Sequence, residues 1–253
     1  MPVHKNGMKH IKWQIIFGIS LIALSVCIYF IQVEIFKTPR ETFFLLFQDL
    51  AFIPISVLMV TLIIDQLLRT REKRALLKKM NMVIGAFFSE VGTTLLKSLA
   101  DFDLNFDKIR RNLVITSDWS EQDFFHVRKQ LGEYDYNVNS EKAALENLKH
   151  FLIGKRDFLL GLLENPNLLE HESFTDLLWA VFHLTEELAS RPDVRGLRDT
   201  DYKHLSVDIR RAYICLISEW VSYMKHLKVA YPYLFSLAVR TNPFDPDASP
   251  EVK

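Results

Sequence analysis

Two long runs of apolar residues follow one another near the N-terminus of this 253-residue chain. The first, residues 13–33, contains no charged residue, and the second, residues 43–64, contains only Asp49. A helix that crosses a bilayer needs about 20 residues at a rise of about 1.5 Å each. Each run is long enough, so the pattern predicts a transmembrane hairpin with residues 34–42 as its short connector.

Basic residues flank this predicted hairpin on both sides. Residues 1–12 carry three lysines and no acid, residues 65–79 carry six basic residues against two acids, and the connector has no net charge. Lys and Arg in short flanks mark the cytoplasmic side of a membrane. We therefore expect both termini in the cytoplasm, the connector outside, and a multi-pass protein of the cell inner (plasma) membrane.

Two other interpretations of the runs are weaker. A cleaved signal peptide has an apolar core of 7–15 residues followed by small residues, whereas residues 29–31 are Tyr, Phe and Ile. Two core helices of a soluble protein rarely reach such lengths without polar positions. We therefore read the first run as an uncleaved anchor.

The second run continues without Gly or Pro into an amphipathic stretch. Apolar residues then recur every three or four positions, which is the spacing of a one-sided helix over residues 65–100. The stripe consists of Leu76, Met80, Val83, Phe87, Val91, Leu95 and Leu99. Beside it, Gly85, Ser89 and Gly92 give a face of small side chains for close helix packing. We expect this face to pack against another helix of the same domain rather than against a second subunit.

The remaining chain predicts an irregular helical bundle with loops at its Pro and Gly positions. Helices are expected over residues 121–133, 141–164, 173–190, 201–230 and 233–239, and residues 113–116 resemble a short strand. The expected organisation is a basic N-terminus (1–12), two spans (13–33 and 43–64) around a loop (34–42), a juxtamembrane helix (65–100), a cytoplasmic helical domain (101–240) and a disordered tail (241–253). The fold class is thus an all-α membrane protein.

Charge and cysteine content exclude some functions. The 31 basic residues equal the 31 acidic residues in number, so a basic nucleic-acid footprint is absent and no nucleic-acid partner is expected. The two cysteines, Cys27 and Cys215, are far apart and form no metal-binding or disulfide pattern. No cofactor is predicted.

Gln48 and Asp49 are polar side chains inside the second run. An ionisable group in a membrane is costly and usually faces the protein or water. Asp49 could belong to an ion site in an oligomer, but a hydrogen bond to Gln48 or pairing with Arg40 near the outer headgroups is the simpler interpretation.

Histidine–carboxylate pairs are the second group of candidates. Four-residue spacing places two side chains on one helix face, and inward-facing pairs can hold metal ions in helical bundles. The metal-ligand candidates are His150, His183, Glu187, His204 and Asp208. Most of these residues lie beside or opposite the apolar stripes of their helices. This favours histidine–carboxylate pairs on the solvated surface over a metal site.

No catalytic motif accompanies these residues. The chain lacks G-x-S-x-G, a P-loop and H-E-x-x-H, and His171-Glu172 lacks the surroundings of a phospho-accepting histidine. The sequence therefore predicts a non-enzymatic, membrane-anchored interaction, scaffold or signalling module. Its expected partners are the lipid bilayer, other copies of the chain, and a cytoplasmic protein. A membrane-bound metalloenzyme and an ion-conducting assembly that uses Asp49 are the alternatives.

Overall fold

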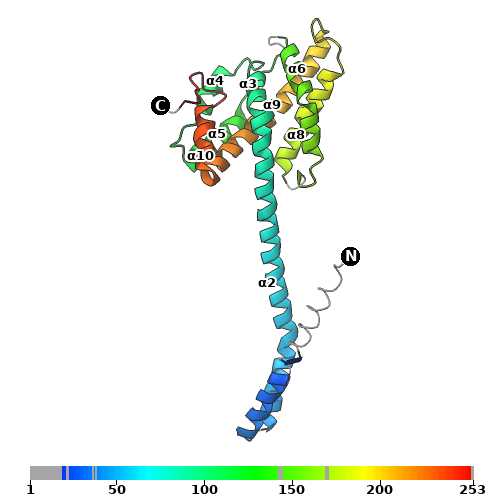
Figure 1. Ribbon diagram of the computed structural model, residues 1–253, viewed down its shortest axis with the longest axis vertical. Helices are drawn as coiled ribbons and strands as arrows, with labels where there is room; N and C mark the ends of the chain where they lie inside the picture. Colours follow the sequence, from blue (N-terminus) through cyan, green and yellow to red (C-terminus); the bar gives the residue numbers. More distant parts are fainter. Residues whose placement is uncertain are drawn as a thin grey trace, which may run out of the picture. The chain divides into compact units, whose positions relative to one another are not determined.

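A computed structural model describes residues 19–20, 23–35, 37, 39–141, 145–168 and 171–251. The chain divides into two units, Met1–Arg71 and Glu72–Lys253. Within the described residues the fold is all-α, with nine named α-helices, no strand, and one isolated β-bridge between Asp103 and Val138 (Figure 1). The prediction of an all-α fold is therefore confirmed.

The first unit contains the helix Ala23–Ile35 and the beginning of α2, which spans Pro39–Phe87. Between them, Lys37 adopts a positive φ of 50° and its amide donates to the Val33 carbonyl at 2.9 Å. This left-handed residue after a helix ends it by capping a free carbonyl. Helix α2 thus begins inside the segment expected to be connector, because Pro39 suits a helix start.

Among the described residues, one helical stretch, Pro39–Ala100, is long and apolar enough to cross a membrane by length and composition, and its apolar part is not buried within the protein. The large apolar side chains from Phe43 to Ile64 are 37–69% exposed. The helix Ala23–Ile35 is apolar but shorter, and most of the rest of the first predicted span lies outside the described residues.

The second unit begins with the end of α2, a π-helical turn η1 (Phe88–Gly92) and α3 (Thr93–Ala100). The Thr93 hydroxyl donates to the Phe88 carbonyl at 2.8 Å, five residues back. The predicted apolar stripe faces inward here, since Met80, Phe87, Val91 and Leu95 are fully buried.

The remaining helices complete the bundle. They are α4 (Asp107–Arg110), the 3₁₀ turn η2 (Arg111–Leu113), α5 (Glu121–Glu133), α6 (Leu145–Gly154), α7 (Arg156–Leu163), α8 (Glu172–Ala189), α9 (Asp199–Ala230) and α10 (Pro232–Arg240). Ser120 and Asp123 form a reciprocal capping box at the start of α5, which satisfies two free amides.

Helices α8 and α9 make the most extensive helix–helix contact of the bundle. Each presents an apolar stripe at three- and four-residue spacing, and its members are completely buried: Leu177, Val181, Leu184 and Leu188 on α8, and Leu205, Ile209, Ala212 and Leu216 on α9. Burying one large aliphatic side chain contributes roughly 1.5–3 kcal/mol, so this contact is a principal source of stability.

Three local predictions are wrong. Residues 113–116 form no strand, because Leu113 closes the 3₁₀ turn η2. The helix expected over residues 141–164 is divided at Lys155, whose φ of −106° and ψ of 2° are not helical; Gly154 weakens the helix there.

The third wrong prediction is that the tail is disordered from residue 241 onward. Phe244 is 1% exposed and Asn242 is fully buried. The Asn242 side chain donates to the Leu113 carbonyl at 2.9 Å, and Arg110 donates to the Phe244 carbonyl at 3.1 Å. One aromatic anchor and two backbone-directed hydrogen bonds therefore fix a segment whose composition resembles a disordered tail.

Gly92 provides a test of this packing. A Cβ atom there would lie 2.5 Å from a ring carbon of Phe88 and 2.9 Å from one of Phe87, so we expect Gly92→Ala to destabilise the domain by about 1–3 kcal/mol. Gly161 has no atom within 4 Å of a Cβ, and Gly161→Ala is the control, with unchanged or slightly higher stability. Denaturant unfolding of both variants in detergent, followed by circular dichroism, checks this. Equal free energies of unfolding for the two variants would contradict the close contact between Gly92 and the two phenylalanine rings.

Candidate functional site

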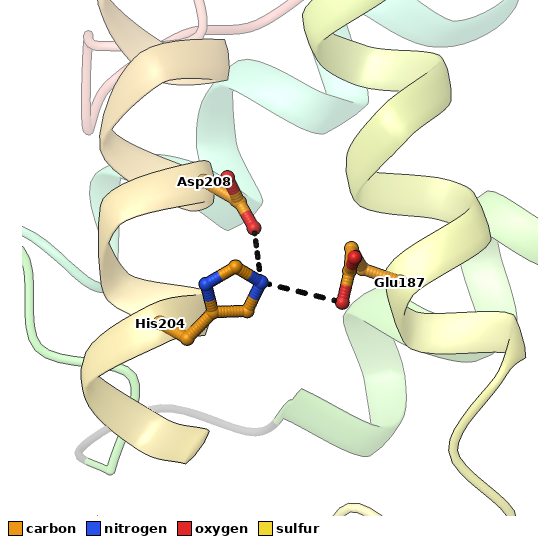
Figure 2. Close-up of side chains that lie close together, drawn as sticks. All are labelled: Glu187, His204 and Asp208. Atoms are coloured by element: carbon orange, nitrogen blue, oxygen red, sulfur yellow. Dashed lines mark ion pairs between the residues drawn. The ribbon is translucent and has the colours of Figure 1, made fainter. Parts of the chain in front are cut away.

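Helices α8 and α9 bring together four of the five predicted metal-ligand candidates. His183 and Glu187 lie one turn apart on α8, and His204 and Asp208 lie one turn apart on α9. Since α8 packs against α9, the two faces oppose each other. Figure 2 shows His204 with its imidazole directed between Asp208 of its own helix and Glu187 of the other.

The distances within this cluster are short. His204 Nε2 lies 3.3 Å from Asp208 Oδ2 and 3.4 Å from Glu187 Oε2. His183 Nε2 lies 3.6 Å from Asp208 Oδ1 and 3.9 Å from Glu187 Oε1. Each histidine therefore meets both carboxylates, and the two histidines use different oxygens of each.

Asp208 is the buried member of the cluster. Its side chain is 3% exposed, and its Oδ2 atom forms no hydrogen bond among the described residues. The expectation of a solvated surface pair is therefore wrong for Asp208. The contact between α8 and α9 covers its carboxylate, whereas the side chains of His183 and His204 stay 45% and 51% exposed.

Arg191, just beyond α8, forms hydrogen bonds with two carboxylates at one edge of the cluster. Its Nη1 donates to Glu187 Oε2 at 2.8 Å and its Nη2 donates to Asp201 Oδ1 at 2.7 Å. These hydrogen bonds from Arg191 lower the pKa of Glu187 and of Asp201 below their ordinary values. Both carboxyls are consequently ionised at neutral pH. No sequence pattern pointed to Arg191, which directly follows the predicted helix 173–190.

A second arginine lies at the opposite edge. Arg211 Nη1 is 3.5 Å from Asp208 Oδ1, but the Arg211 side chain is 57% exposed. Water screens an exposed charge strongly, so Arg211 compensates the buried Asp208 carboxylate only in part.

The chemistry of this cluster is that of cation binding. It offers two imidazole nitrogens and two carboxylates, and the donor atoms of Glu187, His204 and Asp208 all lie within 4.8 Å of one another. Imidazole and carboxylate together suit divalent transition metals. The fifth candidate, His150, is an exposed residue of α6 and is not part of the cluster.

The intramembrane candidates lie in the first unit. Asp49 accepts a hydrogen bond of 3.1 Å from the Tyr29 hydroxyl of the preceding helix, and its neighbour Gln48 is exposed. The sequence interpretation offered Gln48 or Arg40 as the partner of Asp49 and missed Tyr29. Tyr29 and Asp49 lie at similar distances from the connector, so the register of a hairpin could have identified the pair.

The small residues Gly85, Ser89 and Gly92 have different surroundings. A Cβ on Gly85 would lie 3.2 Å from the hydroxyl of Tyr223 on α9. Ser89 is exposed, and Gly92 is buried against phenylalanine rings. Gly85 and Ser89 also line a surface groove.

This groove, which we call the α9–α10 groove, has a volume of about 770 Å³. It is lined by Asn81, Met82, Gly85, Ala86, Phe88, Ser89, Thr93, Thr94, Tyr223, His226, Leu227, Tyr231, Leu234, Leu237, Ala238 and Thr241. None of these is an acidic residue, a lysine or an arginine. Burial lowers the pKa of His226, so it is neutral at pH 7 and the groove carries no charge.

Comparison with known proteins identifies relatives of the chain. Residues 76–240 match the family described as "Uncharacterized protein MJ1433, C-terminal helical domain", and residues 8–68 match the "MJ1433, N-terminal helical domain". The "Uncharacterized protein MJ1433" of Methanocaldococcus jannaschii is 46% identical over 234 residues, which cover 92% of this chain and 94% of the relative. No solved structure matches the chain.

Arg191→Gln tests the ionic bridge beside the cluster. The Arg191 side chain is only 16% exposed, and its removal leaves two carboxylates without their strongest donor, so we expect a loss of about 1–3 kcal/mol in the free energy of unfolding. Arg195, 80% exposed in its pair with Asp193, gives the matched control: Arg195→Gln should leave thermal unfolding unchanged. Equal unfolding curves for the two variants would show that the ion pairs of Arg191 do not stabilise the fold.

Proposed function

The chain belongs to the MJ1433 family of helical proteins, and we propose that it is a membrane-anchored, non-enzymatic interaction module. In this proposal residues 13–33 and 43–64 form a two-helix hairpin in the plasma membrane. Both termini and the helical domain lie in the cytoplasm. The exposed apolar surface of α2 is the observation that carries the proposal.

The surface of α2 between Phe43 and Ile64 suits lipid on all sides. Every residue of this stretch except Ser56 is exposed, and the large side chains are apolar. Soluble proteins seldom expose contiguous apolar patches beyond a few hundred Å². A helix that is apolar all round is buried in a large core or spans a membrane, and the second unit has its own complete core.

The polar groups of this stretch also suit a bilayer. The hydroxyl of Ser56 donates to the Phe52 carbonyl at 3.1 Å, and that of Thr61 donates to the Val57 carbonyl at 2.7 Å. Hydroxyls bonded to their own helix need no water, which the hydrocarbon region lacks. The hydrogen bond from Tyr29 similarly gives Asp49 a partner and favours a structural role for Asp49 over ion conduction.

The proposed topology is tested with single cysteines in a Cys27→Ala, Cys215→Ala background. With a membrane-impermeant maleimide we expect Lys37→Cys to react in intact cells, because the connector faces outward. Lys129→Cys should react only after permeabilisation, since Lys129 of α5 has a side chain that is 66% exposed and lies in the domain placed in the cytoplasm. Labelling of Lys129→Cys in intact cells, or a protein recovered without detergent, would overturn the membrane hairpin.

The interaction surface of the module is the α9–α10 groove. Met82 is 61% exposed, and Leu234 and Leu237 are 40% and 45% exposed. Since the lining residues carry no charge, the groove does not select an acidic or basic partner. An uncharged surface with exposed apolar side chains suits contact with the same surface of a second copy, so we propose that a second copy of the chain occupies the groove and that the protein is a homo-oligomer.

Leu237→Glu tests this assembly, because a carboxylate in the groove would have to be desolvated in the interface. We expect light scattering in detergent to give the mass of an oligomer for the unmodified chain and of a monomer for Leu237→Glu. Leu104 is equally exposed at 43% but lies outside the groove, so Leu104→Glu should keep the oligomer. A monomeric unmodified chain would disprove self-assembly.

A further inference from the structure

The carboxylate of Asp208 is buried with one oxygen unsatisfied. Its side chain is 3% exposed and Oδ2 has no hydrogen bond among the described residues. A buried ionised carboxylate is strongly unfavourable unless a charge or several hydrogen bonds compensate it. Oδ2 lies 3.3 Å from His204 Nε2, and the same nitrogen lies 3.4 Å from Glu187 Oε2 (Figure 2).

The spacing of the surrounding donor atoms matches a small metal ion. An ion with bonds of about 2.0–2.2 Å to nitrogen and oxygen holds tetrahedral ligand atoms roughly 3.3–3.6 Å apart. His204 Nε2 is 3.3 Å from Asp208 Oδ2 and 3.4 Å from Glu187 Oε2. His183 Nε2 is 3.6 Å from the other Asp208 oxygen. Little movement would therefore bring Glu187, His204 and Asp208 around one ion. His183 lies outside the group whose donor atoms are all within 4.8 Å of one another, so its half-exposed side chain would have to turn toward the ion to become a ligand.

We propose that Glu187, His204 and Asp208 bind a divalent transition metal ion of the zinc class, with His183 as the fourth ligand. The two carboxylates contribute two negative charges and the imidazoles bind as neutral ligands, so a divalent ion balances the charge of the four ligands, with Arg211 exposed to solvent beside them. Two imidazoles favour zinc-class ions over Mg²⁺ and Ca²⁺, which prefer oxygen ligands.

Arg191 is compatible with this site. It donates to Glu187 Oε2 at 2.8 Å, and a carboxylate oxygen has two lone pairs, so the same oxygen can also face an ion. Hydrogen bonds of this kind orient metal-binding carboxylates. The charge of Arg191 is balanced by Asp201, which it contacts at 2.7 Å.

An ion has a direct route to the site because the side chains of His183 and His204 are about half exposed. Once bound, it would join α8 to α9 through two ligands from each helix. Four protein ligands are typical of a structural zinc site, whereas a catalytic site keeps a position open for water. The inferred role is therefore to lock α8 against α9, which does not depend on membrane insertion.

The test uses the full-length protein in detergent, stripped with a chelator and titrated with Zn²⁺ alone in a calorimeter. We expect about one ion per chain, retained after desalting, and a higher thermal unfolding midpoint in its presence. His204→Gln and Asp208→Asn should each weaken Zn²⁺ affinity at least tenfold. Bound Co²⁺ should show visible absorption that these variants lose.

His150→Gln is the matched control, since His150 is an exposed histidine of α6 outside the cluster, and its Zn²⁺ affinity should be that of the unmodified chain. If Asp208→Asn fails to fold, His204→Gln decides, because the His204 side chain is 51% exposed. The absence of Zn²⁺ binding, or equal affinity in His204→Gln and the unmodified chain, would show an ion-pair network without a metal. Neither result would bear on the cysteine-labelling test of the membrane hairpin.

Discussion

The packing of α8 along α9 is the contact on which the helical domain depends. Apolar residues at three- and four-residue spacing give each helix one buried stripe, and the two stripes together form much of the core. The same contact brings the polar edges of the helices together, so that Glu187 of α8 faces His204 and Asp208 of α9. Core formation and assembly of the candidate site therefore have one physical cause.

That arrangement has an energetic cost. Covering Asp208 removes a carboxylate from water, and such a charge destabilises a fold unless its surroundings compensate it. The exposed Arg211 and the half-exposed histidines compensate it incompletely, while Arg191 neutralises the neighbouring acids. A cation bound at Asp208 would supply the missing compensation.

Helix α2 carries two different patterns of side chains along its length. From Phe43 to Ile64 its large apolar side chains are exposed on every side of the helix, and Gln48 and Asp49 interrupt them. From Leu76 onward the apolar residues form a single stripe, and Met80 and Phe87 are buried. The helix ends in a π turn at Phe88–Gly92, where the absence of a Cβ on Gly92 allows two phenylalanine rings to approach the backbone.

The sequence by itself determined the helices and the pairing of residues four apart, because both depend on local backbone geometry and on hydrophobic periodicity. It also identified four residues of the candidate site as pairs on separate helices. Only the tertiary structure decided that these pairs meet and that Asp208 is buried, since facing depends on how α8 is rotated against α9. Arg191 and Tyr29 have nearer partners, and their contacts depend on how a loop and a helix connector fold back. The carbonyl of Phe244 accepts from Arg110, which is distant in sequence, and no local pattern specifies a contact that is formed when separate segments pack.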